Sequence, residues 1–229
     1  MKLGVCLLPL IFSCAINNNK NNNVQNDKQR DPVLNSAVHL SDTKIIGDDI
    51  QVNIATGVVI KADNEYNYIL TVAHFCKDVS SKLAVKSTKQ KNNKYTGQVL
   101  SIDANSDLCL IKSLKKDNFF IPIKIAAYEP EIGVLVSTIG APLDFFPIKL
   151  VGYTSINYNI KSLCRSCDLF VLSIPAAGGS SGAPVYNSDY ELVGLISIVN
   201  SEFEHITLAI RLTAIKRFLK NNYFVLNKK

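Results

Sequence analysis

The chain has 229 residues, of which 47% are hydrophobic, and it carries a formal net charge of +6. This length suits one two-layer or two-barrel unit, or two small domains, and the apolar content indicates a well-buried globular body. The basic residues are scattered and form no stripe before the C-terminal segment, so the composition argues against a nucleic acid partner.

The first residues predict export from the cytoplasm. Lys2 precedes the apolar run LGVCLLPLIF, which has the length of a signal-peptide core and is too short to span a bilayer. The run ends in IFSC, which resembles a bacterial lipobox and predicts lipidation of Cys14 at the end of an export segment over 1–14. The alternative is ordinary secretion with cleavage after Ala15. Both interpretations place the mature protein outside the cytoplasm, and the first attaches it to a membrane.

An Asn-rich stretch follows the export segment. The stretch INNNKNNNVQNDKQRDP is polar and holds nothing to bury, and we predict a flexible tether over residues 15–44. From residue 45 onward, short runs rich in Val, Ile, Thr, Tyr and Phe recur at regular spacing and predict strands. The first set of expected strands covers 50–62, 68–73, 82–87, 95–103 and 108–113. The second set covers 134–140, 148–158, 169–174, 183–187, 192–199 and 205–211.

Two groups of about six strands indicate an all-β fold of two packed, six-stranded antiparallel β-barrels within a folded region over 45–229. Barrel one is expected over 45–125 and barrel two over 126–210. The apolar residues of LTAIKRFLKNN then fall on one helical face. This period predicts a short closing helix over 212–222, with Thr213 as its N-cap.

One of the three histidines has the placement of a catalytic base. His74 lies in YILTVAHFC, where an apolar strand ends, and a strand end is a rigid place from which to present a general base. His39 lies in the predicted tether and His205 opens a late strand, so both are interpreted as structural. Asp107 lies in SIDANSDLCLIKS, just before another apolar strand. A carboxylate there either caps a turn or accepts the Nδ1–H of a histidine and fixes its tautomer.

The segment AAGGSSGAPVYN, residues 176–187, has the composition of a nucleophile-bearing turn. Gly179 stands two residues before Ser181 and Gly182 stands one residue after it, and glycines permit the tight backbone that exposes such a serine. We therefore predict Ser181 as the nucleophile, with the amides of Gly179 and Ser181 as an oxyanion hole and Ser180 as a spectator. Taken alone, the segment also fits a plain glycine-serine turn between strands.

In this order, TVAHFC, NSDLCLI and GGSSGAPV resemble the His, Asp and Ser motifs of the chymotrypsin-like serine proteases, and of their HtrA/Deg branch in particular. The resemblance covers about residues 50 to 220, and STIGAPLDF, LVGLISIV and LAIRLTAIKRFL contribute to it. Separations of 33 residues from His74 to Asp107 and 74 from Asp107 to Ser181 suit that branch. The resemblance implies a triad of these three residues, an acyl-enzyme intermediate, polypeptide substrates and no metal or organic cofactor.

The sequence departs from the family pattern in a few places. The family loop usually has a second glycine after the serine, where this chain has Ala183. Ser180 stands where trypsin-like zymogens carry an aspartate, so KIIGDD at 44–49 is interpreted as a chance likeness to an activation site. The chain ends soon after the expected closing helix, and we expect a protease domain alone, with no PDZ domain.

The resemblance also implies which residues meet the substrate. Pro175 falls where trypsin-like enzymes place the charged base of the primary pocket, and Ser197, Ile198 and Val199 form the strand expected to pair with the substrate backbone. Because Val199 replaces a glycine that often leaves this pocket open, an uncharged, partly filled pocket is expected. Such a pocket favours small aliphatic side chains before the cut.

Four cysteines lie outside the export segment. Cys76 and Cys109 are neighbours of His74 and Asp107, and either pair with each other or remain buried thiols. The CRSC motif at 164–167 could close a loop disulfide, and without a second such motif it is a poor zinc site.

These observations predict a lipid-anchored, extracytoplasmic serine endopeptidase. The alternative from another class is a catalytically silent protease-like binding module, which Ala183 favours and the complete triad disfavours. Esterase activity on other acyl groups would use the same chemistry.

Overall fold

The computed structural model describes residues 31–46, 49–88, 94–114, 120–156, 168–199 and 205–227. The predicted export segment with Cys14, the first part of the predicted tether and the CRSC motif lie outside these residues. The folded unit begins at Asp31. Within the described ranges, no helix has the length and apolar character needed to cross a membrane.

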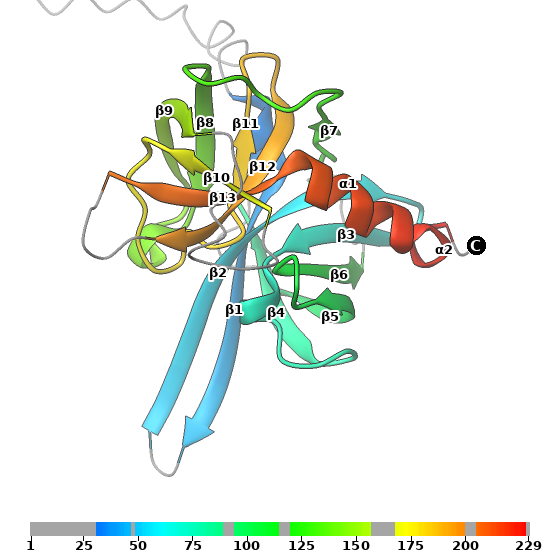
Figure 1. Ribbon diagram of the computed structural model, residues 1–229. Helices are drawn as coiled ribbons and strands as arrows, with labels where there is room; N and C mark the ends of the chain where they lie inside the picture. The colour runs from blue at the N-terminus through cyan, green and yellow to red at the C-terminus, as the bar shows by residue number, and fades with distance from the viewer. Residues whose placement is uncertain are drawn as a thin grey trace, which may run out of the picture. The chain divides into compact units, whose positions relative to one another are not determined.

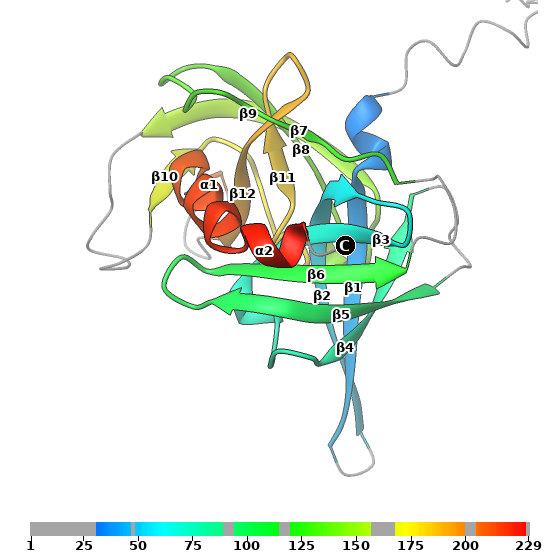
Figure 2. The ribbon, with the colours of Figure 1, turned by 90° about the vertical axis from the view of Figure 1, so that its right-hand side faces the viewer.

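Six antiparallel strands close into barrel one (Figures 1 and 2). Their order around the barrel is β1-β2-β3-β6-β5-β4, and pairing between β1 and β4 closes it. Alternating side chains, such as Leu83 and Val85 of β4, point inward and form its core, as expected for half-buried strands. The strands are β1 (Ala37–Ile46), β2 (Asp49–Ala62), β3 (Tyr66–Thr71), β4 (Lys82–Ser87), β5 (Lys94–Asp103) and β6 (Leu108–Leu114).

Strand β1 corrects the predicted boundary between tether and domain. Residues 31–44 were assigned to the tether, but they belong to the fold: a 3-10 helix, η2 (Pro32–Asn35), precedes β1 and is capped by the Asp31 carboxylate. Val38 and Leu40 of β1 are fully buried in the barrel. Because β1 pairs with both β2 and β4, barrel one could not close without this segment.

Barrel two is also six-stranded. Its order is β11-β8-β9-β10-β13-β12, and pairing between β11 and β12 closes the ring. A short strand, β7 (Lys124–Ile125), adds to β12 in parallel after the connection from barrel one. The prediction of two six-stranded antiparallel barrels is therefore confirmed. The strands are β8 (Leu135–Gly140), β9 (Ile148–Ile156), β10 (Leu169–Leu172), β11 (Pro184–Tyr186), β12 (Glu191–Val199) and β13 (Thr207–Arg211).

The closing helix, α1 (Leu212–Asn221), packs with its predicted apolar face inward. Leu212, Ile215 and Phe218 are buried, and Ile215 and Phe218 join a core cluster that contains residues of both barrels. Thr213 is not the N-cap, because the helix begins at Leu212 without a side-chain cap. The Glu129 carboxylate instead accepts a hydrogen bond from the Thr213 amide at 2.7 Å, a charge that suits a helix N-terminus. A short helix, α2 (Tyr223–Leu226), follows.

Candidate active site

His74 lies just beyond the end of β3, as the sequence predicts. It is the middle residue of a 3-10 turn, η3 (Ala73–Phe75), whose first residue, Ala73, is buried and anchors the turn to the barrel. The His74 side chain is half exposed. The imidazole therefore has a fixed base and an accessible edge, which is what a general base requires.

Asp107 orients the His74 ring. Its carboxylate oxygens lie 3.0 and 3.1 Å from His74 Nδ1, and it also accepts the His74 backbone N–H at 3.0 Å. Asp107 sits in the β5–β6 turn with a left-handed backbone (φ 53°), a conformation that Asp tolerates better than most residues. The contact fixes the Nδ1–H tautomer and leaves Nε2 free as a proton acceptor.

The Asp107 carboxyl is held in its charged form. Burial by itself would raise its pKa, but hydrogen bonds from His74 and Ser197 outweigh burial and lower the pKa below its ordinary value. The Ser197 hydroxyl donates to Asp107 Oδ2 at 2.5 Å. Sequence reasoning placed Ser197 on the substrate-binding strand and missed this contact, which only the packing of β12 against the β5–β6 turn creates.

A disulfide between Cys76 and Cys109 joins the segments that carry His74 and Asp107. Cys76 lies two residues after His74, and Cys109 lies two residues after Asp107. Cys109 is opposite Thr71 in the β3–β6 register. The sequence left open a disulfide or two free thiols, and the structure has the disulfide. It restrains both segments near the His74–Asp107 contact.

The loop around Ser181 has the glycine-dependent backbone that the sequence predicts. Gly179 has φ 94° and Gly182 has φ 82°, in the left-handed region that favours glycine. A Cβ at Gly179 would lie 2.2 Å from the Ala141 carbonyl oxygen, and one at Gly182 would lie 2.0 Å from the Thr56 carbonyl oxygen. Both glycines are therefore needed for this turn to form.

The amides of Gly179 and Ser181 donate to no other residue in the described part of the chain. The peptide that ends in the Gly179 N–H is held through its carbonyl, because the Gly178 oxygen accepts the Leu143 amide at 2.8 Å. In a planar trans peptide the C=O and the N–H point in opposite directions, so this bond also fixes the direction of the Gly179 N–H. Two free, oriented donors are what an oxyanion hole needs.

Thr56 of barrel one stabilises this loop through hydrogen bonds. Its hydroxyl donates to the Gly179 carbonyl at 2.8 Å and accepts the Ala141 amide at 3.0 Å, and its own amide donates to the Ser181 carbonyl at 2.8 Å. Nothing in the sequence distinguishes Thr56 from other β-strand threonines, so this role is not predictable from it.

Ser181 and His74 line the same cleft, of about 570 Å³, together with Gly179, Leu143 and residues 52–55 of β2. The Ser181 hydroxyl donates to the Ser197 carbonyl at 3.2 Å, and no hydrogen bond joins it to His74 within the described ranges. Nucleophile–base hydrogen bonds are often long or absent without substrate. Rotation about the Cα–Cβ bond of Ser181 would turn the hydroxyl away from Ser197.

Ala183 does not need the backbone of the glycine it replaces. It has no positive φ, unlike Gly182, and its methyl group is fully buried beside Gly140. Ser180 is buried as well, and its hydroxyl accepts the Ala177 amide at 3.3 Å, so it stabilises the loop rather than facing the cleft.

The predicted specificity residues are only partly placed. Pro175 is exposed ahead of the loop and does not line the cleft formed by Ser181 and His74. Ile198 and Val199 pair with Leu208 and Thr207 of β13. No group of three or more His, Cys, Asp or Glu side chains suited to a metal ion is found among the residues the structure describes.

Comparison with known proteins agrees with this geometry. A family model described as a trypsin-like peptidase domain matches residues 55–195. Proteins named "Serine protease HtrA-like" from Staphylococcus aureus, for example strains USA300 and COL, are 26% identical over 184 residues, which is 75% of this chain and 24% of theirs. The chain thus spans about a quarter of the length of these curated relatives.

Solved structures share the fold. The active form of the Rv3671c protease from M. tuberculosis has a TM-score of 0.66 at 16% identity, with 82% of this chain and 81% of that chain covered. An inactive mutant form of the same protein has a TM-score of 0.65 at 15% identity, covering 82% of this chain and 87% of that one.

Proposed function

Because this chain belongs to the trypsin-like peptidase family, we propose that it is a serine endopeptidase whose triad is Ser181, His74 and Asp107. In the proposed reaction, Ser181 Oγ attacks the scissile carbonyl carbon while His74 Nε2 takes the hydroxyl proton. The tetrahedral oxyanion accepts hydrogen bonds from the backbone N–H groups of Gly179 and Ser181. Asp107 stabilises the imidazolium that forms.

Collapse of the tetrahedral intermediate breaks the peptide bond. His74 gives its proton to the leaving amine, and the acyl group remains on Ser181 Oγ. A water molecule, deprotonated by His74, then attacks the acyl carbon. The bond from that carbon to Ser181 Oγ breaks, His74 gives the proton to Oγ, and the acid is released. The two steps together return Ser181 and His74 to their starting protonation states.

One observation carries the proposal: an imidazole oriented by a carboxylate, a serine hydroxyl and two amides without a partner among the described residues lie at one cleft. A silent binding module has no need of this set. Its main support in the sequence was Ala183, and the backbone there is one that alanine adopts without strain. We therefore favour the enzyme.

The finer features rest on different support. Small aliphatic side chains before the cut are proposed from the uncharged Pro175 and from Val199, as the family resemblance places them. A location outside the cytoplasm is supported by the Cys76–Cys109 disulfide, since disulfides persist in oxidising compartments. Attachment to a membrane through lipidated Cys14 is proposed from the lipobox-like IFSC alone.

Internally quenched peptides test the activity and the preference together. A series that differs only in the residue before the cut (Val, Ala, Phe, Arg or Asp) would be incubated with the full chain and with Ser181→Ala. Cleavage after Val and Ala that Ser181→Ala lacks is expected. Cleavage that persists in Ser181→Ala would refute the proposed nucleophile, and faster cleavage after Arg or Asp would refute the pocket.

A further inference from the structure

We propose that His39 of β1 and Asp144 of barrel two form a positioning pair that holds the oxyanion hole open. The inference rests on the proposed function and adds to it two residues outside the triad. Sequence reasoning treated His39 as an ordinary structural residue in the tether. The structure places it in contact with the turn that orients the Gly179 amide.

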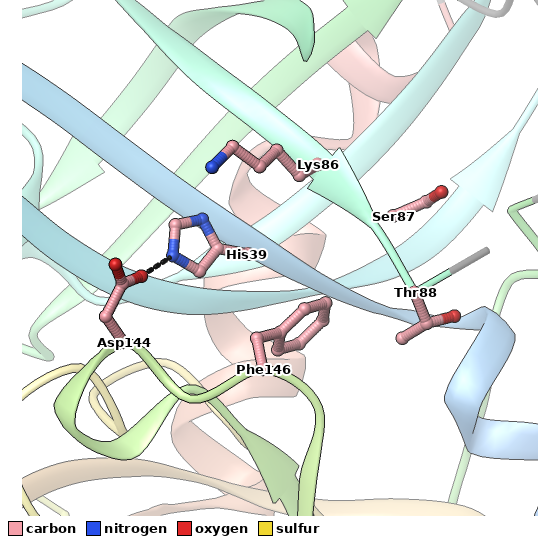
Figure 3. Close-up of a pocket in the computed structure, with 6 residues that line it drawn as sticks. All are labelled: His39, Lys86, Ser87, Thr88, Asp144 and Phe146. Carbon is pink, nitrogen blue, oxygen red and sulfur yellow. Dashed lines mark hydrogen bonds and ion pairs between the residues drawn. The ribbon is translucent and has the colours of Figure 1, made fainter. Parts of the chain in front are cut away.

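His39 is buried, with only 4% of its side chain exposed. Its ring points toward the Asp144 carboxylate (Figure 3). Its Nε2 lies 2.7 Å from Asp144 Oδ1, and Phe146 packs near its ring at 5.7 Å between centroids. Its other nitrogen, Nδ1, is buried without a hydrogen-bond partner among the described residues. The Nε2–H tautomer therefore satisfies the ring best, with Asp144 as its acceptor.

Asp144 belongs to a turn with an unusual backbone. Leu143 and Asp144 of the 3-10 turn η4 (Pro142–Asp144) are consecutive residues with φ of 52° and 66°. Non-glycine residues adopt this region rarely, and it persists where surrounding contacts hold it. The Asp144 side chain is 61% exposed, so His39 supplies a specific attachment that burial does not.

The turn leads directly to the oxyanion hole. Leu143, the residue before Asp144, donates its amide to the Gly178 carbonyl at 2.8 Å, and that peptide carries the Gly179 N–H. The Asp144 amide in turn donates to the Ala141 carbonyl at 3.1 Å, and this is the oxygen nearest to where a Cβ at Gly179 would lie. His39 thus fixes Asp144, Asp144 fixes the Leu143 amide, and Leu143 sets the direction of one oxyanion donor.

Among the described residues that line the pocket around the pair, the other charged side chain is Lys86 of β4, which is opposite His39 in the β1–β4 register (Figure 3). Lys86, Asp144 and His39 line one shallow pocket with Ser87, Thr88 and Phe146. Of the groups in this pocket, His39 is the one whose contact with the Asp144 carboxylate is a hydrogen bond, from Nε2 to Oδ1.

Substitutions at both ends test the pair with kcat and KM of a cleaved peptide. His39→Leu keeps the volume but removes the donor, and we expect a fall in kcat of about tenfold to a hundredfold with KM changed less than twofold, because the oxyanion hole acts on the transition state. His39→Gln, whose amide can donate to Asp144, should retain most of the activity. The matched control, Glu131→Ala, removes an exposed carboxylate of barrel two, the barrel that holds Asp144, and should match the wild type.

A double-mutant cycle separates the pair from two independent structural effects. If Asp144 acts through His39, the double variant His39→Leu/Asp144→Ala should be no slower than the slower single variant. A double variant whose loss of kcat equals the product of the two single losses would overturn the proposal. Equal losses of kcat in His39→Leu and His39→Gln, or an effect confined to a higher KM, would overturn it as well.

A second measurement does not depend on turnover. In ¹⁵N-glycine-labelled protein carrying Ser181→Ala, the Gly179 amide resonance should shift on His39→Leu and keep its position in His39→Gln and Glu131→Ala. An unmoved Gly179 resonance in folded His39→Leu protein would refute the positioning role even if the chain proved inactive. Absence of turnover in the wild type would instead refute the proposed function.

Discussion

Gly179→Ala should remove one oxyanion donor while leaving the rest of the site in place. The added Cβ would lie 2.2 Å from the Ala141 carbonyl oxygen, and the nearest contact that real Cβ atoms make is about 1 Å longer. The obstacle is backbone, and the φ of 94° is itself unfavourable for alanine. The loop must therefore rotate the 178–179 peptide, which turns the Gly179 N–H away from the cleft.

The expected cost follows from that lost donor. Removal of one oxyanion-hole hydrogen bond lowers kcat by roughly 10²- to 10³-fold, or about 3–4 kcal/mol of transition-state stabilisation. KM should change little, because the ground-state carbonyl binds this donor weakly.

Gly178→Ala is the matched control for this experiment. It is the adjacent residue, a Cβ there meets no atom within 4 Å, and its backbone is not left-handed. Steady-state kinetics on one quenched peptide would compare both variants with the wild type. A kcat of Gly179→Ala within tenfold of the wild type, or an equal loss in Gly178→Ala, would refute the assignment of the Gly179 amide.

Three further predictions follow from the site. Replacing Cys76 and Cys109 by alanine opens a loop with a sequence separation of 33 and should cost about 4 kcal/mol of unfolding free energy, measured by urea denaturation; an unchanged midpoint would contradict the bridge. Asp107→Asn should lower kcat by roughly 10³- to 10⁴-fold. The pKa of Asp107 is lowered in the folded state, so the charged carboxylate contributes its full stabilisation above the ordinary pKa of 3.8. This stabilisation is lost as the pH falls through the pKa of the folded protein. Asp107→Asn should therefore flatten the acid limb of a plot of unfolding free energy against pH. Ala183→Gly should cost about 1 kcal/mol in thermal unfolding and leave kcat unchanged, whereas a gain in activity would show that Ala183 impairs the loop.

Much of the fold was predictable because its signals are local. Alternating strand patterns, turn residues between them and one helical face predict both barrels and α1 without any long-range information. The glycine spacing around Ser181 likewise predicts a turn with left-handed residues, and Gly179 and Gly182 have that backbone.

Strand β1 was missed because its evidence is not local. An Asn-rich stretch precedes it, and its polar residues suggest a solvated segment. His39 is nevertheless 97% covered, since the Asp144 turn of barrel two packs over it. Pairing with β2 and β4, which lie later in the chain, makes this strand part of barrel one.

The contacts that organise the site were also beyond the sequence. Pairing of β3 with β6 brings Cys76 to Cys109, and the crossing of β12 brings Ser197 to Asp107. Thr56 reaches Gly179 across the barrel interface in the same way. Each is a long-range consequence of barrel closure, for which spacing along the chain carries no signal.

An activated nucleophile at Ser181 is the central claim, and a fluorophosphonate probe tests it most directly. The full chain would be treated with the probe, weighed intact by mass spectrometry and mapped by proteolysis, beside Ser181→Ala and His74→Ala. The account predicts a single adduct on Ser181 that is absent from Ser181→Ala and forms far more slowly in His74→Ala. Folded wild-type protein that takes up no probe, or an adduct at another residue, would contradict it.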